Sequence, residues 1–256
     1  MEKYTQARER QLKRLREVDP TLEIRWDKVT GAPVRIRGKL SAPQKGKPET
    51  VARRFLEENK ALFPIPNIKD LVLSQVRKDE LGMKHVLFLQ ENRRIPVFGA
   101  GLTVHMGADN SVKEVSGRYH PRIDAPTKPS ITGANAIEAA LKHANEKHRR
   151  PKKPPKIEIF PFKGKYFLAW HVTFSGSDMW MGKSKVPALW EYFVNADTGN
   201  VIFRYNNLRF HASEPSTGTG IGRYAGRVRL NTLHDDGTAT YYLTDRTRDP
   251  AAFPGS

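Results

Sequence analysis

The stretch IPVFGAGLTVHMGADNSVKEVSGRY, residues 95–119, alternates apolar side chains with polar or small ones. The alternation stops at the polar sequence GADN, residues 107–110, and resumes at Val112 and Val115. Two half-buried strands joined by a tight turn have this pattern. Gly99 and Gly101 interrupt the first strand, and a glycine there indicates a bulge or the close approach of another backbone. The stretch therefore predicts a hairpin at the curved centre of an antiparallel sheet.

The residues before this hairpin predict one helix and two more strands. Apolar residues between Pro48 and Pro64 recur at a helical period, which indicates an amphipathic helix of about four turns. Residues 71–78 and 84–90 then have the composition of strands. We expect an α+β unit over residues 49–122 in which the sheet wraps the helix.

Residues 130–207 repeat this plan without a detectable sequence repeat. Thr132 is placed to cap a helix that extends to His148, with small and apolar residues on one face. Four strands are predicted at residues 157–162, 166–174, 189–195 and 201–205. Ser175-Gly176-Ser177-Asp178 is interpreted as a plain turn, because no helix follows it as a nucleophile loop would require.

The predicted fold class is α+β, with two tandem small domains, each an antiparallel sheet wrapped around one helix, followed by an incomplete β-hairpin segment. Residues 1–48 are predicted to form a basic N-terminal arm and linker. Residues 1–19 can form a helix there, but their apolar face is thin, so we expect a solvated arm. Residues 21–40 alternate weakly and suggest an extended hairpin.

Composition excludes several classes of site. The 256 residues contain no cysteine, which leaves His, Asp and Glu as metal ligands and excludes thiol chemistry. No apolar run is long enough to span a membrane, and the first 20 residues are too charged for a secretory signal peptide. The net charge is +17, from 44 basic and 27 acidic residues, and it favours an acidic partner.

Three stretches resemble, in chain order, parts of the precursors of thermolysin-like zinc proteases. Residues 85–119 are similar to the fungalysin/thermolysin propeptide (FTP) domain. Residues 166–207, with LAW at 168–170 and WEYFVNADTGNVIFRYNN from Trp190, resemble a PepSY domain. TGTG at 217–220, LNT at 230–232 and YYLTDRTR at 241–248 are similar to the first strands of the mature enzyme. The resemblance covers residues 49–248.

The resemblance implies a role without catalysis for this stretch. Catalysis in the family needs His-Glu-x-x-His on a helix, and this motif does not occur among the eight histidines of the chain. The zinc and calcium of the family would belong to the catalytic domain, and we expect no cofactor, metal site or catalytic residue in this chain. The expected function is that of an intramolecular chaperone and inhibitor of a thermolysin-like zinc metalloendopeptidase.

The resemblance also implies maturation by cleavage. Residues 208–222 are predicted to be a linker with the processing site, and residues 223–256 to begin the catalytic domain. The linker is polar and rich in Ser, Pro and Gly, as exposed nicking sites are. The candidate processing residues are Phe210, His211, Ala212, Ser213, Glu214, Pro215, Ser216 and Thr217.

The expected partner is a thermolysin-like catalytic domain, in cis or in trans. Apolar residues of the two sheets must face their own helices, so only the alternate polar residues remain free to face a protease. The candidate docking residues are Thr103, His105, Lys113, Glu191 and Arg204. The resemblance implies secretion within a precursor; otherwise we expect a cytoplasmic location.

Two alternative functions stay open at the level of sequence. The chain could be a free-standing protease inhibitor or regulator. It could also be a basic nucleic-acid-binding module, because residues 142–165 hold nine basic and two acidic side chains beside Tyr166, Phe167 and Trp170. Those aromatics are also needed for the core of a small domain, so nucleic acid is the less expected partner.

Overall fold

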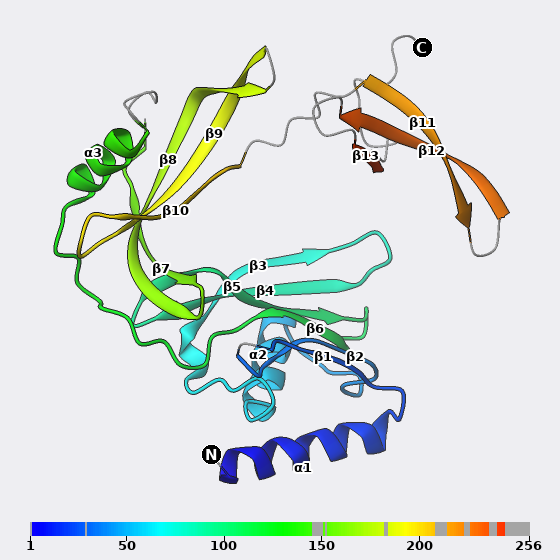
Figure 1. Cartoon of the computed structure of the whole chain (residues 1–256). Coiled ribbons are helices and arrows are strands. Elements are labelled where there is room, and N and C mark those ends of the chain that lie inside the picture. Colours follow the sequence, from blue (N-terminus) through cyan, green and yellow to red (C-terminus); the bar gives the residue numbers. More distant parts are fainter. Residues whose placement is uncertain are drawn as a thin grey trace.

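The computed structural model describes residues 2–28, 30–144, 151, 153–181, 184–207, 214–222, 226–235 and 240–243. The fold class is α+β, as predicted. Within the described residues, ten strands form one mixed, mostly antiparallel sheet, and three more strands form a second sheet. Figure 1 shows that the large sheet carries α2 and α3 on its two halves, so the chain has two units built on one plan.

The first unit packs helix α2 (Pro48–Glu58) against strands β3 (Leu71–Lys78), β4 (Lys84–Asn92), β5 (Ile95–Met106) and β6 (Val112–Arg118). α2 begins with Pro48 in its first turn and buries Val51, Ala52, Phe55 and Leu56. The helix is shorter than predicted, because the Asn59 side chain donates to Phe55 O and caps it. Leu62 is nevertheless fully buried, so its apolar character reflects core packing beyond the helix end.

The central hairpin β5–β6 confirms the pattern of residues 95–119. Alternate residues of β5 are buried against α2: Leu102, Val104 and Met106. At Gly101 a Cβ atom would lie 2.5 Å from Phe88 O, so the expected close approach of a neighbouring backbone is present. The β4–β5 register shifts between Leu89 and Glu91, beside Gly99, whose φ of +67° favours glycine.

The N-terminal residues are part of the first unit, and the prediction of a solvated arm is wrong. α1 (Glu2–Val18) buries Leu15, which is 5% exposed, in the core of α2 and the sheet. The Gln11 side chain also donates to Glu58 O at 2.6 Å. A thin apolar face is enough here, because α1 covers only one margin of an existing core. The hairpin of β1 (Glu23–Trp26) and β2 (Pro33–Arg37) is as expected, and β2 pairs with β6.

The second unit packs α3 (Gly133–His143) on β7 (Lys156–Phe162), β8 (Lys165–Met181), β9 (Ser184–Asn195) and β10 (Val201–Asn206). Thr132 Oγ1 accepts from Asn135 N at 3.2 Å, which confirms the predicted cap. The predicted turn at residues 175–178 is wrong, because these residues continue β8 through a register shift between Ser175 and Ser177. Small polar residues suit a bulge as well as a turn, so the composition misled the prediction.

The sheets of the two units join where β5 and β7 run parallel and Val97 pairs with Ile159. A small apolar cluster of Val97, Ala100 and Ile159 lies at this junction. Figure 1 shows the sheet turning sharply here, so the second unit rises from one end of the first.

The C-terminal strands β11 (Glu214–Gly222), β12 (Gly226–Asp235) and β13 (Thr240–Leu243) form the small antiparallel sheet. The predicted linker 208–222 is therefore wrong in its second half, because Glu214 to Gly222 pairs in register with His234 to Gly226. The C-terminal sheet has three strands, one more than the hairpin we expected. None of the described helices combines the length and apolarity needed to cross a membrane.

Candidate functional site

The outer face of the first sheet, opposite α2, carries two of the predicted docking residues. Val104 and Met106 of β5 are buried in the core, so the intervening Thr103 and His105 point to the other face. Both are half-buried on that face rather than fully exposed. Lys113 is exposed, beside a register shift between β5 and β6.

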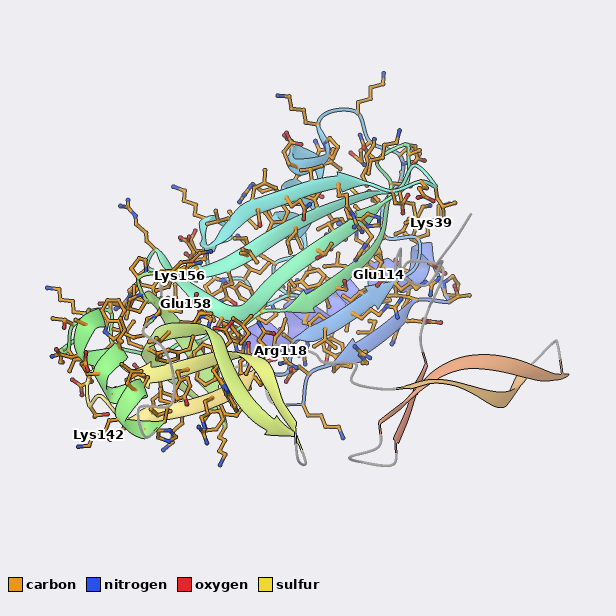
Figure 2. The ribbon with its side chains drawn as sticks, turned by 90° about the horizontal axis from the view of Figure 1, so that it is seen from above. Lys39, Glu114, Arg118, Lys142, Lys156 and Glu158 are labelled. Carbon is orange, nitrogen blue, oxygen red and sulfur yellow. The ribbon has the colours of Figure 1, made fainter. Side chains whose placement is uncertain are left out.

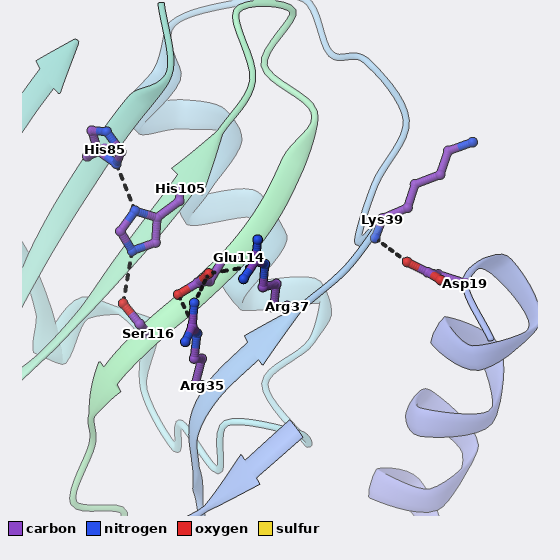
Figure 3. Close-up of polar contacts among 8 residues, drawn as sticks. All are labelled: Asp19, Arg35, Arg37, Lys39, His85, His105, Glu114 and Ser116. Atoms are coloured by element: carbon purple, nitrogen blue, oxygen red, sulfur yellow. Dashed lines mark hydrogen bonds and ion pairs between the residues drawn. The ribbon is translucent and has the colours of Figure 1, made fainter. Parts of the chain in front are cut away.

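His105 is the middle of a chain of polar contacts across three strands (Figure 3). Its Nδ1 lies 2.7 Å from Nδ1 of His85, and its Nε2 lies 2.9 Å from Ser116 Oγ. His85 Nε2 in turn lies 3.0 Å from Asp79 Oδ2. Burial lowers the pKa of His105, and the hydrogen bond from His85 is the main cause that lowers the pKa of Asp79.

Glu114 lies beside this chain and is held by arginines of β2. Arg35 donates to both carboxylate oxygens, at 2.8 and 2.9 Å, and Arg37 lies 4.0 Å from one of them. A bidentate pair fixes geometry more than it adds stability at an exposed surface. The outer face of the first sheet is therefore a preorganised polar surface of mixed charge.

Glu191 does not lie on an exposed face, and the prediction that it is free to meet a partner is wrong. It is 6% exposed and accepts hydrogen bonds from His171 at 2.8 Å, Thr173 at 2.6 Å and Asn207 at 3.2 Å. Glu158 approaches the other nitrogen of His171 at 3.4 Å. Burial alone would lower the pKa of His171, but its contacts with Glu158 and Glu191 raise that pKa to about 9.

Arg204 lies on the opposite face of the second sheet from Glu191. β10 pairs Arg204 with Tyr192 and Tyr205 with Glu191, and residues opposite one another share a face. Arg204 donates to the Tyr192 hydroxyl at 3.0 Å and lies over the Trp190 ring at 5.3 Å. The structure therefore distributes the five predicted docking residues over separate surfaces and does not bring them together.

The processing residues lie mostly outside the described part of the chain. Phe210, His211, Ala212 and Ser213 are not among the described residues. Glu214, Pro215, Ser216 and Thr217 lie in β11, paired with His234, Leu233, Thr232 and Asn231.

A cavity of about 730 Å³ lies where the two units meet. Tyr119 and His120 line it from the first unit, and Tyr166 from the second. His120 Nδ1 lies 3.0 Å from the Tyr166 hydroxyl, and the Gln90 side chain clamps the backbone of His120 through two hydrogen bonds of 2.8 Å. Sequence reasoning missed this cavity, because it depends on the β5–β7 pairing and no local motif marks it.

Two of the three aromatic residues considered for stacking nucleic-acid bases, Tyr166 and Trp170, have internal partners. Trp170 packs beside α3 and donates from Nε1 to Ile131 O at 3.0 Å. Tyr166 is the partner of His120. Figure 2 shows Lys39 and Lys142 at opposite ends of the body formed by the two units. Residues 145–150 and 152 of the basic stretch lie outside the described residues, so the nucleic-acid alternative stays a prediction.

Comparisons with known proteins place the first unit in a family. Residues 69–119, from the start of β3 to the end of β6, match the fungalysin/thermolysin propeptide motif. The chain is 28% identical to bacillolysin of Brevibacillus brevis over 223 residues, which is 82% of this chain and 40% of the relative. It is 28% identical to thermolysin of Alicyclobacillus acidocaldarius subsp. acidocaldarius over 247 residues, 89% of this chain and 44% of the relative. This chain contains a thermolysin-like protease propeptide region.

One further relative and one solved structure are also similar to parts of this chain. Neutral protease B of Bacillus subtilis (strain 168) is 33% identical over 160 residues, which is 60% of this chain and 27% of the relative. The propeptide region thus aligns with less than half the length of each of these three relatives. Among solved structures, the Bacillus megaterium YpeB C-terminal domain matches with a TM-score of 0.36 and 12% identity, covering 80% of this chain and 97% of that one. The PepSY resemblance of the second unit stays a prediction.

Proposed function

We propose that this chain is a non-catalytic propeptide that assists the folding of a thermolysin-like zinc metalloendopeptidase and inhibits it until cleavage. The observation that carries the proposal is the propeptide motif over residues 69–119, within alignments that cover more than four-fifths of this chain in two protease relatives. On this proposal the zinc, the calcium and the catalytic residues belong to the protease domain, and the precursor is secreted.

A physical argument supports the chaperone role. A large fold with many non-local contacts must lose loop-closure entropy before those contacts form, which slows folding and exposes apolar surface. A preformed surface that fits the folding intermediate lowers that barrier. The first unit offers such a surface, because its core joins two helices and six strands without needing the protease: α1, α2 and β1 to β6.

Inhibition follows from the same complementarity. A surface that stabilises the native protease by binding also covers part of the protease. The bound propeptide then occludes the substrate cleft until the propeptide is removed. Charge supports this step: a chain of net charge +17 associates fastest with an acidic partner. A free-standing inhibitor acting in trans uses the same surface, so the two readings differ in covalent linkage and not in contact chemistry.

The test is refolding of a denatured relative in the presence of the chain. The catalytic domain of bacillolysin from Brevibacillus brevis is diluted from denaturant with and without equimolar propeptide chain, and casein cleavage is measured after the chain has been digested. We expect more recovered activity with the chain present, and inhibition before digestion.

Two variants make the test specific. Val86→Asp places a charge in the core of the first unit, where Val86 is fully buried, and should abolish both effects. Glu80→Gln changes an exposed turn residue and should leave both unchanged. Equal recovery of activity with Val86→Asp and with the unchanged chain would show that assistance does not depend on the folded propeptide.

A further inference from the structure

We propose that the sheet faces opposite α2 and α3 form one apolar docking surface for the catalytic domain of the protease. We call this surface the open face; its apolar members are Val72, Leu89, Phe98, Phe162, Phe203 and Tyr205. The inference rests on the proposed function and extends it, because the docking residues expected from the sequence are mostly polar. Figure 1 shows α2 below the first sheet and α3 on the far side of the second, so both parts of the open face border the angle between the sheets.

In the first unit the open face is apolar beside the edge strand β3. Val72 of β3 pairs with Leu89 of β4, and these side chains are 41% and 48% exposed. Phe88, the neighbour of Leu89, is buried in the core with α2, so the pair of Val72 and Leu89 lies on the opposite face. Adjoining apolar side chains with this exposure indicate a surface that binds a partner.

Phe98 connects this pair to the second unit. Leu89 and Glu91 lie on the same face of β4, and Glu91 pairs with Pro96 of β5. Phe98 is two residues farther along β5 than Pro96, so it lies on that face as well. The centroid of its ring is 4.6 Å from that of Phe193 in the second unit. The open face is therefore continuous across the junction.

In the second unit aromatic rings form the open face. Tyr192 packs beside α3, so its neighbour Phe193 points away from that helix. Phe203 of β10 pairs with Phe193 and shares its face. Phe203 is 40% exposed, and its ring centroid lies 5.5 Å from that of Phe162 and 5.9 Å from that of Tyr205. Clustered aromatic side chains contribute much of the binding energy where proteins associate.

The charge beside these rings favours a protein over nucleic acid. Burial, and after it the charges of Glu191 and Glu158, raise the pKa of Tyr205, so both carboxylates lie near this ring. The two carboxylates contact a single histidine, His171, which leaves an excess of negative charge. Surfaces that bind single-stranded nucleic acid combine aromatic rings with a basic groove. An apolar centre with polar groups around it is instead the anatomy of a protein interface.

The course of the chain selects the protease domain as the occupant. Phe203 and Tyr205 lie in β10, which ends the second unit, and the next described strand begins at Glu214. The chain from Asn206 to Glu214 can span at most about 28 Å. A domain that continues the chain is therefore held close to the open face, and this chain spans less than half the length of its protease relatives. So short a connection gives a high effective concentration, and an apolar contact of modest affinity then suffices in cis.

The first test measures inhibition of the catalytic domain of Brevibacillus brevis bacillolysin by the full chain added in trans. Phe203→Ser and Leu89→Ser should each raise the inhibition constant at least tenfold, mainly through faster dissociation. The loss should persist at high salt, because salt does not screen apolar contacts. Phe203→Leu keeps an apolar side chain and should retain most of the inhibition. Val18→Ser removes an exposed apolar residue of α1, outside the open face, and should leave the inhibition constant unchanged.

The outcomes separate the surface from the function. If the unchanged chain inhibits, and Phe203→Ser and Leu89→Ser inhibit equally well, the open face is not the docking surface and the proposed function stands. A loss with only one of these two variants would overturn the continuity of the surface across the units. No inhibition by the unchanged chain would overturn both the surface and the function. Retention of a single-stranded oligonucleotide that is lost with Phe203→Ser, without any effect on inhibition, would assign the rings to nucleic acid.

A second test uses the unchanged chain, so it does not depend on how the variants fold. The chain is mixed with a bacillolysin catalytic domain in which the glutamate of His-Glu-x-x-His is replaced by glutamine, so that it is not digested. Oxidation of side chains by hydroxyl radicals is then compared with and without this domain. Leu89, Phe203 and Tyr205 should be oxidised several-fold more slowly in the complex. Trp26, which is 38% exposed and lies under Arg8 of α1, should be oxidised at the same rate. Protection of Trp26 or α3 without protection of Phe203 would contradict the proposal.

Discussion

Gly101 illustrates how one residue fixes the curvature of the first sheet. A Cβ atom there would lie 2.5 Å from Phe88 O, far inside contact distance, although the backbone conformation itself suits other residues. Gly101→Ala should therefore destabilise the protein by about 3 kcal/mol, through overpacking of a close strand pair. The measurement is urea unfolding followed by circular dichroism.

Gly99 is the control for this prediction. It has a φ of +67° but open space around the position of a Cβ. Asparagine tolerates this conformation, so Gly99→Asn should cost less than about 1 kcal/mol. A Gly101→Ala protein that loses no more stability than Gly99→Asn would mean that the contact with Phe88 O does not require glycine.

The buried ion cluster at His171 makes stability depend on pH. The pKa of His171 is raised from 6.5 to about 9 in the folded chain. A raised pKa contributes stability that is complete below the unfolded value and is lost as the pH rises through the folded value. Unfolding free energy should therefore fall between about pH 6.5 and pH 9 because of this group.

Substitution of Glu191 tests the cluster directly. Glu191→Gln removes one of the two carboxylates that contact the charged His171. It should lower the free energy of unfolding by about 3 kcal/mol at pH 7, and that free energy should then fall less steeply toward pH 9. Glu80→Gln removes an exposed carboxylate and should change neither value. A Glu191→Gln protein as stable as the unchanged chain at pH 7 would show that His171 is neutral there.

At the scale of elements, α1 tests whether the N-terminal residues belong to the first unit. Leu15 is buried in the core, whereas Val18 on the same helix is 53% exposed. Leu15→Ala should lower the unfolding free energy by about 2 kcal/mol, and Val18→Ala should change it by less than about 0.5 kcal/mol. If both substitutions change the unfolding free energy by equally small amounts, α1 does not pack on the core and the N-terminal residues form a solvated arm.

The strand β11 narrows the expected processing site. A protease needs an extended, unpaired substrate segment, and residues from Glu214 onward are paired with β12. Early cuts in limited proteolysis should therefore fall between Asn207 and Glu214, a range that holds only the first four of the eight candidate residues. Mass spectrometry of the first fragments gives the position. First cuts within β5 or β6 would contradict the assignment of the propeptide unit.

The elements were predictable where their signals are local. The alternation of β5, the Thr132 cap and the proline at the start of α2 each depend on neighbouring residues. The docking of α1 was not predictable, because Leu15 is buried by residues distant in the sequence. The same holds for residues 175–178, where small polar side chains fit either a turn or a bulged strand.

At the scale of the whole molecule, pairing across the chain decides the candidate sites. The sequence shows His85 and His105 as two isolated histidines, and only the register of β4 with β5 places them opposite each other. Glu191 and Arg204 were expected on one polar face, but the pairing of β9 with β10 places them on opposite faces. The parallel contact of β5 with β7 and the cavity beside it depend on tertiary packing alone.

The positions of Lys113 and Arg204 indicate which unit contacts the protease. Lys113 is exposed on the unit that carries the propeptide motif, whereas Arg204 is engaged with Tyr192 and Trp190 on the α3 side of the second unit. The two cations therefore lie on different units, and only Lys113 is on the unit with the family motif. We expect the contact through the first unit, because that unit carries the family motif.

Charge reversal separates the two surfaces. Lys113→Glu should slow association with the bacillolysin catalytic domain about tenfold at low salt, with the difference shrinking as salt screens the interaction. Arg204→Glu should leave the association rate unchanged, although loss of its contact with Tyr192 should lower the stability of the second unit. Stopped-flow measurement of inhibition at several salt concentrations gives both rates. Charge reversal slows association only when the charge lies on the face that the partner approaches. A slower rate with Arg204→Glu and an unchanged rate with Lys113→Glu would therefore show that the protease docks on the α3 side of the second unit.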